Sequence, residues 1–150
     1  MMLVDQQKIT YQIDQEKLTA KILPSINVEN NIRISRSFVY ETQEYIITEM
    51  QEGAFRNSFI RSLTFDDDSA NDSIPKNAFA SSSIESIDFP RNLRELKEGW
   101  CHQTQKLTNI TISSKNKYFK VSKEGLLLQK SRNDSKNYDI LNFSKRDIHD

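Results

Sequence analysis

The strongest constraint on the fold is an unusual spacing of apolar residues that occurs three times. In the segment NAFASSSIESIDFP, residues 77–90, an Ala-Phe pair precedes a polar gap and then three apolar residues spaced by three and by two positions. This spacing fits neither an amphipathic helix nor a strictly alternating strand. Such a spacing, repeated at a nearly constant period, indicates an internal repeat. The three units are GAFRNSFIRSLTF (residues 53–65), NAFASSSIESIDF (77–89) and GWCHQTQKLTNITI (99–112).

Each unit ends in a short strand with one apolar face, at residues 63–65, 87–89 and 110–112. The outer two residues of each strand point to one side and the middle residue points to the other. One such strand cannot bury its apolar face alone, but strands stacked at a constant period form a parallel sheet with continuous apolar columns. Another column precedes the pairs, at Met50, Ile74 and Leu96. We therefore predict an open solenoid of three units over residues 50–113.

One segment of the repeat region also admits a helix. Leu93, Leu96 and Trp100 fit one face of a helix that begins after Pro90. The repeat accounts for all three units, whereas the helix accounts for one, so we favour the solenoid.

The flanking segments predict β caps in a single domain of residues 1–150. Residues 9–22 alternate around a DQEK turn and indicate a hairpin, and Ile32 and Ile34 begin a second pair of strands. A turn at residues 41–44 is expected between the FVY and YIIT segments. We assign residues 1–49 to an N-terminal antiparallel block, because a solenoid must cover its first open face. Residues 114–143 are expected to cap the other end with a strand and hairpin, which leaves a tail at 144–150.

Composition excludes several classes of function. The formal net charge is zero and no basic stretch stands out, so we expect no nucleic-acid partner. No apolar run is long enough for a spanning helix, and the N-terminus lacks the pattern of a secretory signal, so we expect no membrane insertion.

Four Asn-x-Ser/Thr sequons occur, as an Asn- and Ser-rich chain produces by chance, at Asn71, Asn109, Asn133 and Asn142.

The residues that could carry catalysis occur singly and not in a known catalytic motif. Cys101 and His102 are adjacent, but neighbours in an extended chain point to opposite sides and cannot readily share a proton. Cys101 falls in the column of the Phe residues, so we expect a buried, inert thiol. The acidic run at 66–68 lacks the spacing of a calcium loop. We expect no enzyme, no catalytic residue, no cofactor and no metal, including at the terminal Asp147, His149 and Asp150.

The outward-facing residues of the predicted strands form the candidate binding face. Small polar side chains predominate there, which fits either a recognition surface or a face that is merely soluble. The candidate site residues are Ser62, Thr64, Asp66, Ser86, Asp88, Asn109, Thr111 and Ser113.

At these units the chain resembles the BspA-like leucine-rich repeat, in which an Ala-Phe pair precedes a short strand. The matching stretches are MQEGAFRNSFIRSLTF, IPKNAFASSSIESIDFP and LKEGWCHQTQKLTNITI, and the resemblance extends over roughly residues 18–143. The array is short and degenerate, since the third unit has Trp-Cys in place of Ala-Phe and only Pro90 follows a strand.

The resemblance implies a mainly β, open leucine-rich-repeat solenoid with short parallel strands and no enzymatic activity. It implies a surface or secreted adhesion module that binds a protein or glycan partner. An intracellular scaffold, a fragment of a larger repeat protein and, least favoured, a hydrolase that uses the acidic run with His102 or His149 remain the alternatives.

Overall fold

The regular secondary structure of the described part of the chain consists of β-strands, and no helix occurs there. The computed structural model describes residues 1–132, 137, 138 and 140–143. The strands are β1 (Met2–Val4), β2 (Thr10–Asp14), β3 (Thr19–Ile22), β4 (Asn31–Ile34), β5 (Ser37–Tyr40), β6 (Gln43–Met50), β7 (Ser62–Phe65), β8 (Ser73–Ile74), β9 (Ser86–Phe89), β10 (Glu95–Leu96), β11 (Asn109–Ile112), β12 (Phe119–Val121), β13 (Leu127–Gln129) and β14 (Ile140–Phe143).

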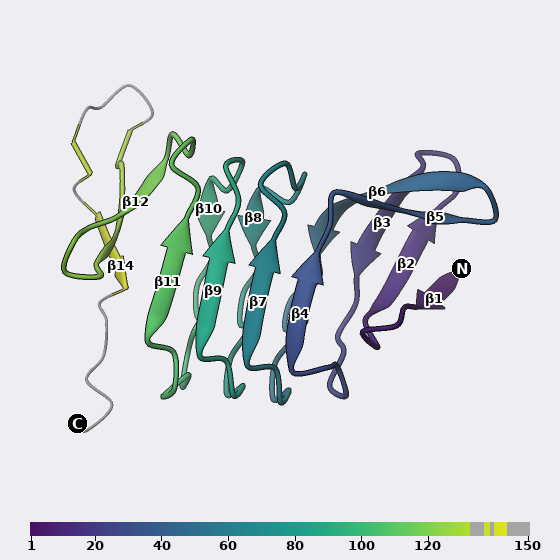
Figure 1. Ribbon diagram of the computed structural model, residues 1–150, viewed down its shortest axis with the longest axis horizontal. Coiled ribbons are helices and arrows are strands. Elements are labelled where there is room, and N and C mark those ends of the chain that lie inside the picture. The colour runs from purple at the N-terminus through teal and green to yellow at the C-terminus, as the bar shows by residue number, and fades with distance from the viewer. Residues whose placement is uncertain (133–136, 139, 144–150) are drawn as a thin grey trace.

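A four-stranded parallel sheet in the order β11-β9-β7-β4 forms one wall of the solenoid (Figure 1). The register is constant, since Leu63 lies beside Ile87 and Ile87 lies beside Ile110. These three side chains are buried, as the alternation within each strand predicts. The open solenoid predicted from the sequence is confirmed, with one more turn than expected.

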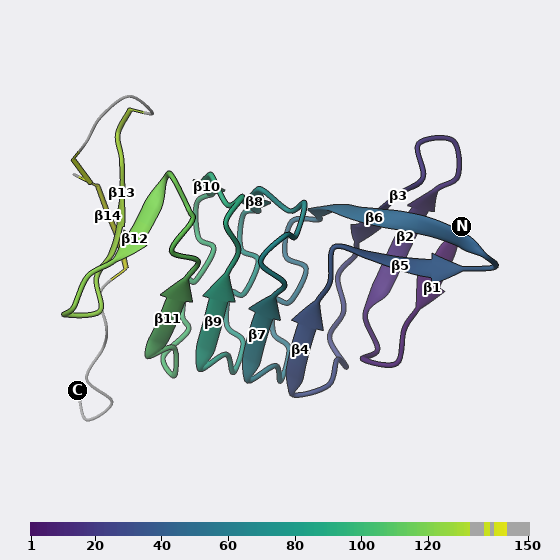
Figure 2. The ribbon, with the colours of Figure 1, turned by 45° about the horizontal axis from the view of Figure 1, so that its top comes forward.

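The opposite wall consists of short strands behind the first sheet (Figure 2). β10 pairs in parallel with β8, which places Leu96 beside Ile74. β6 contacts β8 and therefore continues the same wall. β3 extends it by one more strand, because Ile22 lies beside Met50 of β6. The predicted column of apolar residues therefore extends into the N-terminal block, and the alternative helix at residues 90–100 does not form.

The Ala-Phe pairs lie in tight turns that stack on one another. Phe55 and Phe79 are fully buried, and their rings stack with centroids 5.8 Å apart. A left-handed backbone precedes each pair, at Gly53, Asn77 and Gly99. Gly and Asn are the residues that adopt this conformation at least cost, which explains the GAF, NAF and GWC sequences. At Gly99 a Cβ would also collide with Oδ1 of Asn77 in the neighbouring turn.

Cys101 was expected in the core, and the structure corrects this expectation. It is half-buried rather than buried, although its position in the turn matches that of Phe79. The turn at residues 99–104 is the last of the three stacked turns, so no further Phe covers this position. The indole of Trp100 fills the interior instead and packs edge-on against Phe89, with ring centroids 5.8 Å apart.

The N-terminal block differs from the expected one in two respects. β4 belongs to the solenoid sheet and not to the cap, because it pairs in parallel with β7. The remaining sheet, in the order β1-β2-β3-β6-β5, is not wholly antiparallel, because β3 and β6 run parallel. The hairpins predicted at 9–22 and around the turn at 41–44 are both present. Alternation alone cannot distinguish a cap strand from a solenoid strand, because both bury every second side chain.

A three-stranded sheet in the order β12-β13-β14 follows the last turn of the solenoid, at the C-terminal end of the described chain (Figure 1). Asn116 joins it to the solenoid through four hydrogen bonds. Its Nδ2 donates to the carbonyl oxygens of Pro90 and Leu93, and its Oδ1 accepts from the backbone amides of Tyr118 and Phe119. The amide side chain therefore satisfies backbone groups that the end of the repeat would otherwise leave buried and unpaired.

Candidate binding face

The candidate binding face is the outward surface of β4, β7, β9 and β11. The register aligns the middle residues of these strands in one column, which consists of Arg33, Thr64, Asp88 and Thr111. Arg33, Thr64 and Thr111 are exposed, and Asp88 is half-exposed. With strands about 4.8 Å apart, the column extends over about 14 Å.

A second column follows the first residue of each strand, at Asn31, Ser62, Ser86 and Asn109. Adjacent residues in the columns hydrogen-bond across the sheet. Ser62 Oγ donates to Asn31 Oδ1 at 2.8 Å, and Thr111 Oγ1 donates to Asp88 Oδ1 at 2.9 Å. These side-chain bonds hold the polar groups of the face in fixed orientations. The groups therefore lose less conformational entropy when a partner binds.

The remaining predicted residues, Asp66 and Ser113, lie one position beyond the strands and are half-buried. Asp66 accepts a hydrogen bond of 2.6 Å from Nε of Arg33, and this bond together with the negative charge raises the pKa of the guanidinium. Ser113 Oγ accepts from the backbone amide of Lys115, in the turn that follows β11. Six of the eight predicted residues therefore share the face, and these two border it.

Sequence reasoning missed two residues of the face, Asn31 and Arg33. The sequence of β4, NIRI, differs from that of β11, NITI, at one position, and this similarity was the available signal. No Ala-Phe pair precedes β4, so the repeat pattern did not include it. A shallow hollow of about 490 Å³ lies over this end of the face, lined by Asn31, Ile32, Arg33, Ser62, Thr64, Phe65, Asp66 and Asp67.

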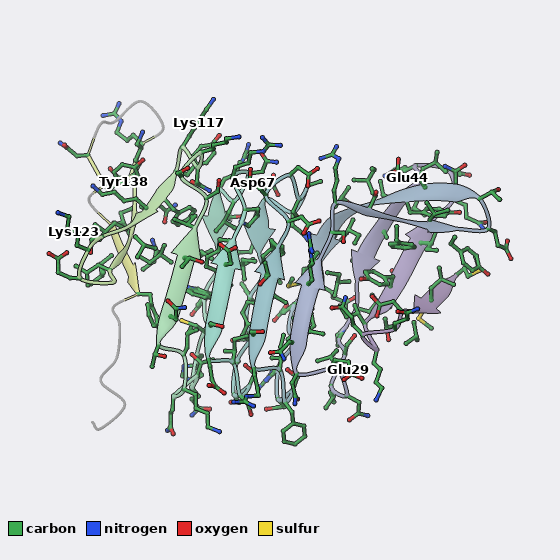
Figure 3. All side chains as sticks on the ribbon, viewed as in Figure 1. Glu29, Glu44, Asp67, Lys117, Lys123 and Tyr138 are labelled. Carbon is green, nitrogen blue, oxygen red and sulfur yellow. The ribbon has the colours of Figure 1, made fainter. Side chains whose placement is uncertain are left out.

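Ion pairs between successive turns border the face. Arg61 Nε lies 2.9 Å from Glu85 Oε2, and Arg91 Nε lies 3.7 Å from Asp67 Oδ2. Asp67 is located where β7 and β9 end (Figure 3). Because these pairs are exposed, each contributes at most about 1 kcal/mol to the free energy of folding. They connect successive turns, and within the acidic run Asp67 is paired with Arg91 and Asp66 with Arg33.

The residues considered for metal binding form no cluster in the described part of the chain. Within residues 1–132, 137, 138 and 140–143, no group of three or more His, Cys, Asp or Glu side chains could hold a metal ion. Asp147, His149 and Asp150 lie outside the described residues, as does the sequon at Asn133. Of the other sequons, Asn71 is buried and Asn109 is exposed on β11. In the described chain, no helix has the length and apolarity needed to span a membrane.

Comparison with known proteins identifies the family. The sequence pattern of the BspA type leucine rich repeat region matches residues 23–123 with six copies of the repeat. The chain belongs to this family. The matched region begins in the loop after β3 and includes β4, in agreement with the position of β4 in the parallel sheet. A search of curated proteins returned no significant match.

Several solved structures of bacterial proteins show a weak similarity to this chain. A cell surface protein of Faecalibacterium prausnitzii is 14% identical, with a TM-score of 0.42 over 89% of this chain and 59% of that chain. The pneumococcal vaccine antigen PcpA is 13% identical, with a TM-score of 0.42 over 87% of this chain and 54% of that chain. A repeat protein of Bacteroides ovatus is 12% identical, with a TM-score of 0.43 over 72% of this chain and 40% of that chain. The chain thus spans about half the length of these proteins.

Proposed function

We propose that the chain is a non-catalytic binding module that holds a protein or glycan partner across the outward face of β4, β7, β9 and β11. The observation that carries the proposal is the single polar column of Arg33, Thr64, Asp88 and Thr111. An extended partner that crosses the strands would contact one residue from every turn. The face of stacked strands is the surface that curved solenoids use for recognition.

The composition of the face favours a polar partner. Its side chains are hydroxyls, amides and paired charges, and hydrogen bonds already orient several of them. Such a surface supports directional hydrogen bonding with peptide or sugar groups more than burial of apolar area. Family membership favours an adhesion role at a cell surface over an intracellular scaffold or a structural fragment of a longer array. A hydrolase is least favoured, because Asp66 and Asp67 of the acidic run are paired with arginines.

Charge reversal at the centre of the face tests the proposal. A glycan array and a pull-down from cell-surface extracts first identify the partner, and binding is then measured by calorimetry. Asp88→Arg should weaken that binding at least about tenfold, because a charge of the wrong sign at the centre of an interface costs several kcal/mol. Its free energy of unfolding should change by less than about 1 kcal/mol, since a half-exposed residue and one hydrogen bond are altered.

Two control variants make the result specific. Glu52→Arg reverses an exposed charge on the Ala-Phe side of the solenoid and should leave binding unchanged. Deletion of residues 144–150 removes His149 and the terminal acids and should also leave binding intact. Full binding by Asp88→Arg, together with loss of binding on deletion of the tail, would locate function at the C-terminus and reject the proposal.

A further inference from the structure

The two edge strands of the N-terminal sheet line the same hollow. The sheet order β1-β2-β3-β6-β5 leaves β1 and β5 at its two edges. A hollow of about 370 Å³ is lined by Leu3 and Val4 of β1 and by the whole of β5, together with Tyr11, Arg33 and Ile47. The sheet therefore curls so that its open edges approach one cavity, whose volume lies in the range of ligand sites.

Aromatic side chains form the interior of this hollow. The ring of Phe38 packs on Tyr11 with centroids 4.9 Å apart and on Tyr45 with centroids 5.9 Å apart. Phe38 itself is half-exposed, so one side of the aromatic cluster is open. Val39 is 68% exposed and Val4 is 66% exposed on the two edge strands. The hollow thus contains an uncovered aromatic and aliphatic patch, with polar residues around it.

The charged groups at the rim already have partners within the chain. Asp5 accepts from the backbone amides of Gln7 and Ile9 and from the Tyr11 hydroxyl, at 2.9 to 3.0 Å. Burial, with the nearby Asp5 carboxylate, raises the pKa of Tyr11, so its hydroxyl remains a donor. Arg33 is held by Asp66, and Glu44 accepts from Ser37. A charged ligand would therefore have to break existing bonds to bind here.

The backbone of β5 carries the hydrogen-bonding groups that face the hollow. Residues 41 and 42 both have positive φ and form a two-residue turn between β5 and β6. The Ile47 amide donates to the Arg36 carbonyl, so Arg36 and Ile47 form a hydrogen-bonded pair. Hydrogen-bonded and non-hydrogen-bonded pairs alternate along an antiparallel ladder, so residues 38 and 40 also bond to β6. The amides and carbonyls of Ser37 and Val39 consequently point away from β6. The strand SFVY contains no charge and no proline, which are the usual protections of a sheet edge.

From these observations we infer that the hollow binds an extended peptide segment of a partner protein, which adds to β5 as a further strand. The peptide backbone pairs with Ser37 and Val39, and alternate apolar side chains pack on Phe38 and Tyr11. A peptide fits better than a sugar or an ion, because backbone amides are what the hollow leaves unpaired. A single strand fits better than a second copy of this chain, because the edge lies within a concave site and not on a flat rim.

The probe is an acetylated, amidated peptide of seven alternating threonine and valine residues, with binding followed by fluorescence anisotropy of a labelled form. The whole chain should bind it, and the amide of Val39 should gain protection from hydrogen exchange. The same peptide with every backbone nitrogen methylated keeps its side chains and loses its donors. It should bind at least roughly tenfold more weakly, as expected when several hydrogen bonds are lost.

Val39→Pro provides the matched variant of the protein. It removes one outward amide and none from the β5–β6 ladder, where an edge proline is tolerated. It should weaken peptide binding roughly tenfold, whereas Val39→Thr, which keeps the amide, and Asp88→Arg should not. Absence of binding by the unmethylated peptide, or equal binding of both peptides, would overturn the inference. Dimerisation of the chain alone that Val39→Pro abolishes would also overturn it, by assigning the edge to a second copy.

Discussion

At the scale of single residues, the core of the solenoid depends on rings that contact their counterparts in neighbouring turns. Phe89 is 1% exposed and lies between Phe65, with ring centroids 6.3 Å apart, and Trp100. It therefore belongs to two inter-turn contacts at once. A cavity at this position would open between three turns, and the structure gives the surrounding side chains little freedom to close it.

Phe89→Ala should consequently lower the free energy of unfolding by about 3–5 kcal/mol. Phe59 supplies a matched control, because it is the same residue type in the same repeat region and is 67% exposed. Phe59→Ala should change stability by less than about 0.5 kcal/mol. Urea denaturation followed by circular dichroism measures both values. Equal effects of the two substitutions would show that residues 84–89 do not form an interior strand.

Cys101 shows where reasoning about a single residue from sequence reaches its limit. Its position in the repeat was predicted correctly, since the turn at 99–104 stacks on the turn at 77–82. The burial of Cys101 was predicted incorrectly. Burial depends on whether another turn follows, and the pattern within one unit does not contain this information. The same limit applies to Trp100, whose ring is buried and packs against Phe89.

At the scale of elements, two buried asparagines have opposite roles. Asn116 makes four hydrogen bonds that join the C-terminal sheet to the last turns of the solenoid. Asn71 is 1% exposed, and no group among the described residues bonds to either atom of its side-chain amide. Asn116 thus connects two parts of the fold. The buried amide of Asn71 instead lowers the free energy of unfolding, because it is buried without a hydrogen bond.

The two asparagines should therefore differ when replaced by alanine. Asn116→Ala should destabilise the chain by about 2–4 kcal/mol, because it leaves several buried backbone groups unpaired. Asn71→Ala should cost less than about 1 kcal/mol, because it removes an amide that has no partner to lose. Thermal and chemical denaturation of the two variants test the difference. A cost for Asn71→Ala as large as that for Asn116→Ala would contradict it.

The hairpins and the three repeat strands were predictable because each has a local signature: alternation around a polar turn, or an Ala-Phe pair at a fixed distance before a strand. The direction in which a strand pairs has no such signature. Residues 31–34 alternate like a hairpin strand, and their parallel pairing with β7 is decided by contacts 31 positions away in the sequence. For the same reason Arg33 was absent from the predicted face.

At the scale of the whole molecule, the binding proposal requires that four turns place one residue each in a single outward column. Both walls and the stacked turns support this arrangement, and β4 extends the face to the hollow over Arg33. Arg33 also lines the hollow of the N-terminal sheet, so the two proposed sites share one residue at their boundary. The position of β4 thus determines the extent of the face and its relation to the second site.

Disulfide formation between two introduced cysteines, in a chain that carries Cys101→Ser, tests the position of β4 directly. Facing residues on adjacent strands are about 4.8 Å apart, within the span of a disulfide, whereas residues two strands apart are about 9.6 Å apart and beyond it. Under mild oxidation, Arg33→Cys with Thr64→Cys should lose its free thiols, and Arg33→Cys with Asp88→Cys should retain them. Retention of free thiols in the first pair, or their loss within the monomer in the second, would contradict the four-turn column.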